Sequence, residues 1–279
     1  MTEPLFANHS GRSRLPGNPD APLIVAIHGG TYTSAYFDVP GYSLLDRAAA
    51  RGLPILAPDR FGYGTTPLLP QAQMTLAGQA QALVPGLRDA WSRYGAGRPG
   101  MVLIAHSIGA GIACHIAGQP EDLPLLGLAI SGVGMRTPEG HQEMWESLPD
   151  IPLVSLPDEG KDHFMFGPPG SFDDDMPSAS HCANTTAPKA ELVDIVSTWH
   201  LHAQETLGRI AVPVHYRQAE FDNLWVVDEG EVDAFRAALT ASPRADAALV
   251  KGTGHCIDFH FAGAKLQEEQ LDFAVALSR

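Results

Sequence analysis

Short apolar runs alternate with longer stretches of helical periodicity along the first half of this 279-residue chain. The short runs are typical of buried strands, and the stretches with Leu and Ala on one face are typical of helices. Because parallel strands are usually joined by a helical crossover, this order predicts a mostly parallel sheet covered by helices. The expected strands are residues 22–28, 54–59, 101–105 and 125–131, and the expected helices are residues 41–51, 75–94 and 108–118.

The alternation stops between residues 134 and 207, where eight prolines separate short pieces rich in Phe, Met, Trp and His. A stretch of this length without a strand pattern is too long for a plain loop in a compact domain. Strand and helix patterns return at residues 212–216, 229–239, 247–251 and 261–277. We therefore predict a core made of residues 1–134 and 208–279, with residues 135–207 inserted as a cap.

The balance of charge excludes several classes of partner. The chain has 18 basic and 32 acidic residues, a formal net charge of −14, which would repel a phosphate backbone and anionic lipid headgroups. Residues 1–5 lack the basic start of a secretory signal, and no apolar run approaches the length of a membrane span. We expect a cytoplasmic protein that binds neither nucleic acid nor membranes.

The strongest local signal is a serine placed between an apolar strand and a helix. Ser107 follows the strand at residues 101–105, and small residues lie two positions before and after it, Ala105 and Gly109. A sharp strand-to-helix turn strains the serine backbone and leaves no room for bulk at these positions. The turn would expose the hydroxyl, and the helix start would offer the amide of Ile108 to a developing oxyanion.

Residues 109–114, Gly-Ala-Gly-Ile-Ala-Cys, also begin like a dinucleotide-binding fingerprint at the start of a helix. This alternative is disfavoured, because the motif ends in Cys114 where Gly or Ala is required and lies far downstream of the first expected strand.

With these features the chain resembles the α/β-hydrolase fold family, over nearly its whole length. Residues 27–31, Ile-His-Gly-Gly-Thr, look like the family's loop after the third strand, which carries the second oxyanion amide, here Gly30. Residues 59–65 resemble the first seven positions of its D-x-P-G-x-G-x-S turn, with Phe61 replacing Pro. The resemblance implies an α/β fold with a doubly wound, mostly parallel sheet and a helical cap inserted after the sixth strand.

In that family the acid and the histidine follow the serine, in the order Ser, Asp, His. Asp222 lies just beyond the expected strand at 212–216, and His255 lies beyond the strand at 247–251. His255 would act as general base toward Ser107, and Asp222 would orient the imidazole. Glu220 remains an alternative acid, whereas Asp258 is too close in sequence to His255 to reach its far nitrogen.

Several other residues are candidates for a substrate pocket. Thr31 and Tyr32 directly follow the oxyanion loop, and Trp225 lies just beyond the acid. The aromatic side chains of the cap could line an apolar pocket or attach the cap to the core. Those we select as pocket candidates are Trp145, Phe164, Phe166 and Trp199.

The histidines of the cap do not predict a metal site. The pair His200 and His202 is followed by Ala, Gln and Glu, so the Asp and His of a metallohydrolase motif are missing. We expect no metal and no cofactor.

The function that these residues favour is a serine hydrolase. It would cleave a carboxylic ester, lactone or thioester of a small hydrophobic molecule through an acyl-enzyme on Ser107. The same three residues could instead serve carbon–carbon bond hydrolysis, acyl transfer or cyclisation. A non-catalytic ligand-binding protein is disfavoured, because binding alone does not require Ser107, His255 and Asp222 together.

Overall fold

The computed structural model describes residues 5–119 and 123–278, and residues 1–4, on which part of the expectation of a cytoplasmic protein rests, lie outside it. Its seven-stranded sheet has the order β1-β3-β2-β4-β5-β8-β9, and only the β1–β3 pair is antiparallel. The mostly parallel sheet is therefore confirmed. Its strands are β1 (Gly11–Arg14), β2 (Leu23–Ile27), β3 (Ile55–Pro58), β4 (Met101–His106), β5 (Leu125–Ser131), β8 (Val214–Ala219) and β9 (Ala245–Val250).

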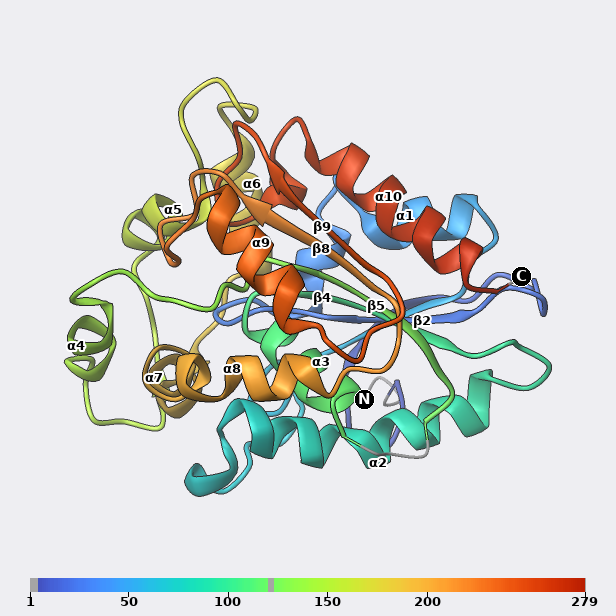
Figure 1. Cartoon of the computed structure of the whole chain (residues 1–279). Helices are drawn as coiled ribbons and strands as arrows, with labels where there is room; N and C mark the ends of the chain where they lie inside the picture. The colour runs from blue at the N-terminus through green and yellow to red at the C-terminus, as the bar shows by residue number, and fades with distance from the viewer. Residues whose placement is uncertain (1–4, 120–122, 279) are drawn as a thin grey trace.

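Helices cover both faces of this sheet, as a doubly wound fold requires (Figure 1). One layer contains α1 (Leu44–Ala50) and α10 (Gly263–Ala276). The other contains α2 (Leu76–Tyr94), α3 (Ile108–Ala117), α8 (Trp199–Gly208) and α9 (Glu229–Ala238). Because both faces are covered, every residue of β2 and β4 is buried, which explains their uninterrupted apolar runs.

The helices expected at residues 41–51 and 75–94 begin slightly later, where a side chain caps them. Ser43 accepts a hydrogen bond from the Asp46 amide, and Thr75 accepts one from the Gly78 amide. Short 3-10 helices lie at Ser34–Asp38, Gln71–Gln73, His181–Ala183 and Ile257–Phe259.

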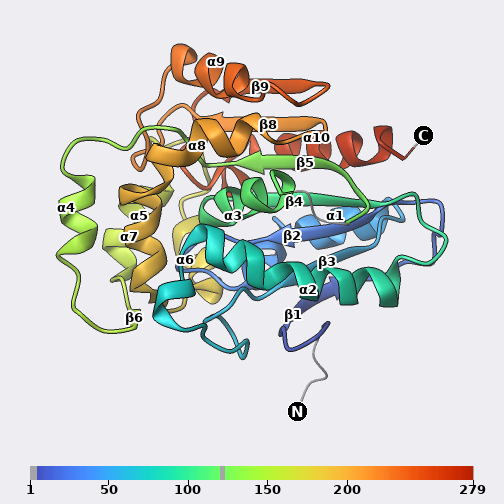
Figure 2. The same ribbon diagram turned by 60° about the horizontal axis from the view of Figure 1, so that its bottom comes forward.

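The chain between β5 and β8 leaves the sheet, although these two strands are neighbours within it. This segment, residues 132–213, lies largely beyond the carboxyl ends of the parallel strands (Figure 2). Helix α8, which the expected cap includes, instead packs against α3 and α9 in the layer on the sheet. The other elements are α4 (His141–Glu146), β6 (Leu153–Val154), α5 (Asp158–Met165), α6 (Met176–Ser180), β7 (Ala187–Pro188) and α7 (Lys189–Ser197).

Five strands precede this segment, not six, which corrects the expected position of the insertion. Within the described part of the chain no strand precedes Gly11. Residues 5–9 form only a tight turn closed by a bridge between Phe6 and His9, so they add no further strand to the sheet.

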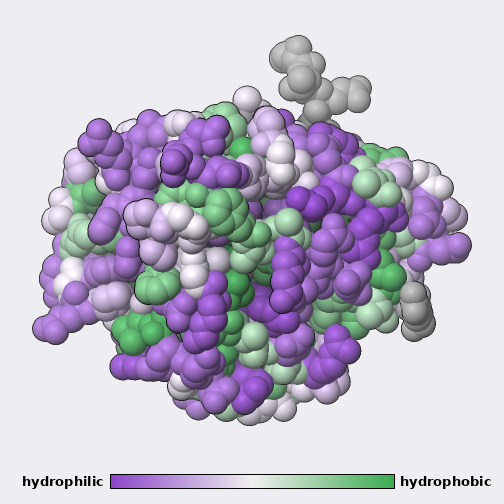
Figure 3. Space-filling model, turned by 90° about the horizontal axis from the view of Figure 1, so that it is seen from above, coloured by the Kyte–Doolittle hydropathy of each residue, from purple (hydrophilic) through white to green (hydrophobic). Residues whose placement is uncertain are grey.

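None of the described helices is both long and apolar enough to cross a membrane. On the face in Figure 3, hydrophobic side chains form patches separated by hydrophilic ones.

A buried ion pair joins the segment between β5 and β8 to the core. Arg60 follows β3, Glu191 lies on α7, and their side chains are 1% and 0% exposed. The guanidinium donates from Nη1 to Glu191 Oε2 at 2.7 Å and from Nη2 to Oε1 at 3.0 Å. It also donates to the carbonyls of His28 at 2.8 Å and Gly29 at 3.0 Å. One side chain therefore holds both the loop after β2 and helix α7.

The turn from β4 to α3 is strained and closely packed. Ser107 has φ 58° and ψ −129°, in the region that favours glycine. A Cβ on Gly109 would lie 2.3 Å from the Ile27 carbonyl oxygen and 2.4 Å from that of His28. The small residue expected at position 109 is thus required by the backbone of the loop after β2.

Substituting Gly109 by Ala should lower the free energy of unfolding by about 2 kcal/mol or more, because rigid backbone must move. Urea unfolding measures this. Gly160→Ala is the matched control, since its Cβ would meet nothing within 4 Å on exposed α5, and it should stabilise by up to about 1 kcal/mol. Equal stability of the two variants would contradict the close packing at position 109.

Replacing Glu191 by Gln should lower the free energy of unfolding by about 3 kcal/mol, because it leaves the buried charge of Arg60 without its counter-ion. The control is Glu205→Gln, which breaks an exposed pair with Arg209 and should change stability by less than about 0.5 kcal/mol. A Glu191→Gln variant as stable as that control would show that the buried pair does not hold the segment in place.

Candidate active site

Ser107, His255 and Asp222 form one chain of hydrogen bonds at the carboxyl edge of the sheet. They follow β4, β9 and β8 respectively, and parallel strands bring these ends together. The Ser107 hydroxyl lies 2.9 Å from His255 Nε2, and His255 Nδ1 lies 2.8 Å from Asp222 Oδ2. His255 is 0% and Asp222 5% exposed, so this chain of contacts is shielded from water.

The Asp222 carboxylate is held by two further donors. Gln218 Nε2 donates to Oδ2 at 2.8 Å, and the Leu224 amide donates to Oδ1 at 3.0 Å. Both oxygens are therefore satisfied while one of them faces His255. This arrangement fixes the carboxylate and, through it, the orientation of the imidazole.

The two alternative carboxylates lie elsewhere. Glu220 accepts a hydrogen bond from the Gly252 amide at 2.8 Å, so it braces the loop after β9 and does not contact His255. Asp258 is buried and accepts from the Tyr36 hydroxyl at 2.9 Å and Gln267 Nε2 at 3.0 Å. Of the three acids considered from the sequence, Asp222 is the one that the fold brings to His255.

A second histidine braces the loop that carries His255. His260 Nε2 accepts from the amides of Gly254 and Gly167, each at 3.0 Å, and Nδ1 donates to the Cys256 carbonyl at 2.9 Å. Such a ring must be neutral, and burial lowers the pKa of His260. It joins the loop of His255 to the segment after α5.

The loop after β2 holds its own neutral histidine. His28 is fully buried, donates from Nδ1 to the Gly29 carbonyl and accepts the Arg60 amide at Nε2. Burial lowers the pKa of His28 to about 3. His28 therefore braces the loop that contains Gly30 and is not placed as a base for Ser107.

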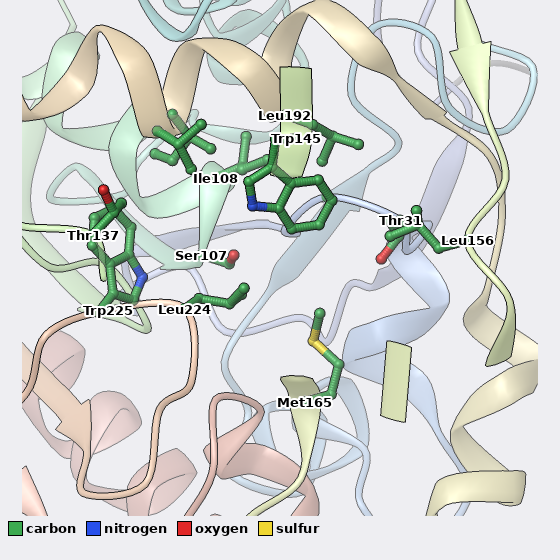
Figure 4. A pocket seen from close by; sticks show the side chains of 13 residues that line it. Thr31, Ser107, Ile108, Thr137, Trp145, Leu156, Met165, Leu192, Leu224 and Trp225 are labelled. Atoms are coloured by element: carbon green, nitrogen blue, oxygen red, sulfur yellow. The ribbon is translucent and has the colours of Figure 1, made fainter. Parts of the chain in front are cut away.

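A pocket opens over Ser107, with Gly30 and Ile108 beside it (Figure 4). Of the pocket residues expected from the sequence, Thr31, Trp145 and Trp225 line it. None of the described lining residues carries a charge. The lining residues that the sequence reasoning missed are Thr137, Leu156, Met165, Leu192, Ile195, Val196 and Leu224.

Four expected pocket residues point elsewhere, which corrects that part of the prediction. Tyr32 packs against Tyr36 and lies beneath the Lys161 ammonium, 3.2 Å from its ring centroid. Trp199 donates to the Gly134 carbonyl inside the core. Phe164 packs against Trp145 from outside the pocket, and Phe166 lines a separate outer groove.

A signal for part of the missed lining was present in the sequence. Leu192, Ile195 and Val196 recur at the spacing of one helix face, and they are the face of α7 that meets the pocket. Leu156 precedes α5 and Met165 is its last residue. Neither belongs to a comparable pattern, because their direction depends on how the segment folds back over Ser107.

Acidification should destabilise the protein well above the pH at which carboxylates titrate. Burial lowers the pKa of seven histidines, at positions 9, 28, 106, 115, 141, 215 and 260. Below pH 6.5 these histidines are protonated in the unfolded chain but stay neutral in the folded chain. The free energy of unfolding is therefore highest above pH 6.5 and decreases as the pH falls.

Urea unfolding at pH 7.5 and pH 5.0 tests this, with a lower free energy of unfolding expected at pH 5.0. His115→Gln should flatten the dependence by up to about 1.4 kcal/mol per pH unit, since burial lowers the pKa of His115 to about 4 and the residue lies away from the pocket. A free energy that rises toward pH 5.0 would contradict the neutral state of these rings.

Comparison with solved structures shows the same architecture in enzymes of very different sequence. A thermophilic esterase from Thermogutta terrifontis matches with a TM-score of 0.69 and 16% identity, covering 96% of this chain and 94% of that chain. The monoacylglycerol lipase of Paleococcus ferrophilus matches with a TM-score of 0.69 and 15% identity, covering 96% and 99%.

A third similar structure is the 2-hydroxy-6-oxo-6-phenylhexa-2,4-dienoate hydrolase of a Rhodococcus species. Its TM-score is 0.65 at 16% identity, with 95% of this chain and 96% of that chain covered. At such low identity these likenesses show the fold alone. No curated protein sequence matches the chain.

Comparison with a family model tests the amino-acid sequence itself, and not only the fold. The model of the alpha/beta hydrolase family matches residues 24–265, from β2 into α10. This range contains the Ser107 turn, the loop after β2 and the strand ends that carry Asp222 and His255. The chain therefore belongs to the alpha/beta hydrolase family.

Proposed function

We propose that this protein is a serine hydrolase that cleaves a carboxylic ester, lactone or thioester through an acyl-enzyme on Ser107. The observation that carries the proposal is the hydrogen-bond chain from Ser107 to His255 to Asp222, with distances of 2.9 and 2.8 Å. A hydroxyl held on a strained turn against a buried, oriented imidazole is the arrangement of an activated nucleophile.

The reaction then follows from these groups. Ser107 Oγ attacks the carbonyl carbon while His255 Nε2 takes the hydroxyl proton. The bond from carbon to the leaving oxygen or sulfur breaks, and His255 returns the proton to that atom. Water then loses a proton to His255 and attacks the acyl-enzyme, which releases the acid and restores Ser107.

The oxyanion formed in both steps would be bound by the amides of Gly30 and Ile108. Ile108 is the first residue of α3, so its amide lies at the positive end of the helix dipole. Gly30 directly follows His28 and Gly29, whose carbonyls accept hydrogen bonds from Arg60. It lies beside Ile108, since a Cβ added at Gly30 would be 2.9 Å from Ile108 Cδ1. This support keeps the loop in one conformation.

The pocket favours a small, neutral substrate with a hydrophobic portion. Its described lining is mostly apolar and uncharged, and its volume is only about 50 Å³. We propose that helices α4 to α7, within the expected cap of residues 135–207, act as the cap that encloses this substrate. They contribute Trp145, Leu192, Ile195 and Val196 to the lining.

The same features favour cleavage of an ester over cleavage of a carbon–carbon bond. A carbon leaving group departs with carbanion character, and the described lining offers no charged group that could stabilise it. An alkoxide or thiolate needs only the proton that His255 carries.

A fluorophosphonate probe should add once to the wild-type protein, as read by intact mass, because it reacts with activated serines. Ser107→Ala and His255→Ala should abolish the adduct while thermal unfolding shows both variants folded. A wild type without an adduct, or an adduct that persists in Ser107→Ala, would contradict the proposal.

The role of Asp222 as the acid of the site is tested by replacing Asp222 and the nearby Glu220, each by its amide. Asp222→Asn should lower kcat on 4-nitrophenyl esters by about 10⁴-fold, because the imidazole loses its orientation. Glu220→Gln, which alters a contact to the Gly252 amide, should cost less than about tenfold. A larger loss for Glu220→Gln would transfer the role of the acid to Glu220.

A further inference from the structure

Thr31 brings a buried hydroxyl without a partner into the pocket. Its residue is 3% exposed, and Oγ1 has no hydrogen-bond partner among the described residues. Figure 4 shows its oxygen on the side that faces Ser107 and Met165. Other buried threonines satisfy their hydroxyls locally: Thr66 donates to the Asp59 carbonyl and Thr253 to the Val250 carbonyl. Among the described residues, five others also carry a buried side-chain nitrogen or oxygen without a partner, but Thr31 is the one of this group that lines the pocket: the others are Arg47, His141, His215, Gln267 and Gln270.

The direction of this side chain is held by the backbone. Thr31 has φ 62°, which is unfavourable for a β-branched residue. Its amide donates to the Tyr63 hydroxyl, and its carbonyl accepts from Lys161 Nζ at 2.9 Å and the Thr185 amide at 3.0 Å. Three contacts thus hold Thr31 in a strained backbone conformation. Both this strain and the unpaired hydroxyl lower the stability of the folded protein, and such a loss is typical of residues with a function.

Besides the reacting serine, the rest of the pocket leaves Thr31 and the Trp145 indole nitrogen as polar groups near Ser107, and of these two only the Thr31 hydroxyl can accept a hydrogen bond as well as donate one (Figure 4). Lys161 is directed at the Thr31 carbonyl and does not line the pocket, and the Trp225 indole donates to the Gly132 carbonyl at 3.1 Å. Thr137 is half-buried and also lines an outer groove with Arg136 and His200, so it lies at the mouth.

We propose that Thr31 is a specificity-determining residue whose hydroxyl forms a hydrogen bond with a second oxygen of the substrate, close to the scissile carbonyl. The substrate class is then a small, neutral ester or lactone that carries one hydroxyl or keto oxygen besides the ester group. This inference rests on the proposed function. A substrate without that oxygen buries the Thr31 hydroxyl unpaired, and this penalty sets the preference.

The second oxygen can lie on the acyl or the alcohol side of the ester, and two pairs of esters distinguish these sources. In each pair a hydroxyl replaces a methyl group at constant shape. Ethyl 3-hydroxybutyrate and ethyl 3-methylbutyrate test the acyl side. 2-Hydroxyethyl butyrate and propyl butyrate test the alcohol side. The preference is the ratio of kcat/KM for the hydroxylated ester to that for its partner.

We expect the wild type to prefer the hydroxylated member of one pair by about tenfold or more. Thr31→Val keeps the shape and removes the hydroxyl, so it should reduce that preference by about tenfold while the melting temperature stays equal or rises. Thr137→Val, the same change at the mouth of the pocket, should alter the preference by less than about threefold.

The outcomes separate this inference from the proposed function. An adduct on Ser107 together with equal rates for both members of each pair would overturn the role of Thr31 alone. An equal loss of kcat on both members in Thr31→Val would assign its hydroxyl to the reacting carbonyl, which also overturns it. A wild type without an adduct and without hydrolysis of any ester would overturn the proposed function itself.

Discussion

The buried guanidinium of Arg60 is the contact on which the arrangement of the site depends. A charge with 1% exposure is tolerated only when every donor finds an acceptor. Its acceptors come from three places: Gln79 on α2, the carbonyls of His28 and Gly29, and Glu191 on α7. The loop after β2 and helix α7 are therefore held by the same buried guanidinium.

Around this centre the backbone is strained at two residues that line the pocket. Ser107 and Thr31 have φ 58° and 62°, and both conformations persist because surrounding contacts determine them. The missing side chains of Gly29 and Gly109 allow the loop after β2 to approach the Ser107 turn, since a Cβ at Gly29 would lie 2.8 Å from that of Ser107. Strain and close approach together fix where the hydroxyl lies relative to His255.

The site combines residues of the sheet with a pocket wall from another part of the chain. Ser107, His255 and Asp222 are carried by strand ends, whereas most of the pocket wall comes from helices and loops between β5 and β8. The proposed role of Thr31 depends on both, because Lys161 on α5 and Thr185 near β7 hold its carbonyl. The segment thus both lines the pocket and holds a residue of the core that lines it.

Six of the seven strands of the sheet and the turn at Ser107 could be predicted from the sequence, because strand periodicity and small residues are local patterns. Strand β1 was not predicted, and the roles of Asp222 and His255 came from the resemblance to the family. The sequence placed β5 at the residues observed and misplaced helix starts only by a few residues. Only the tertiary structure decided that Thr31 lines the pocket while Tyr32 turns away, that Glu191 pairs with Arg60, and that α8 joins the core layer. These outcomes depend on the direction of side chains between segments far apart in the chain, which no local pattern encodes.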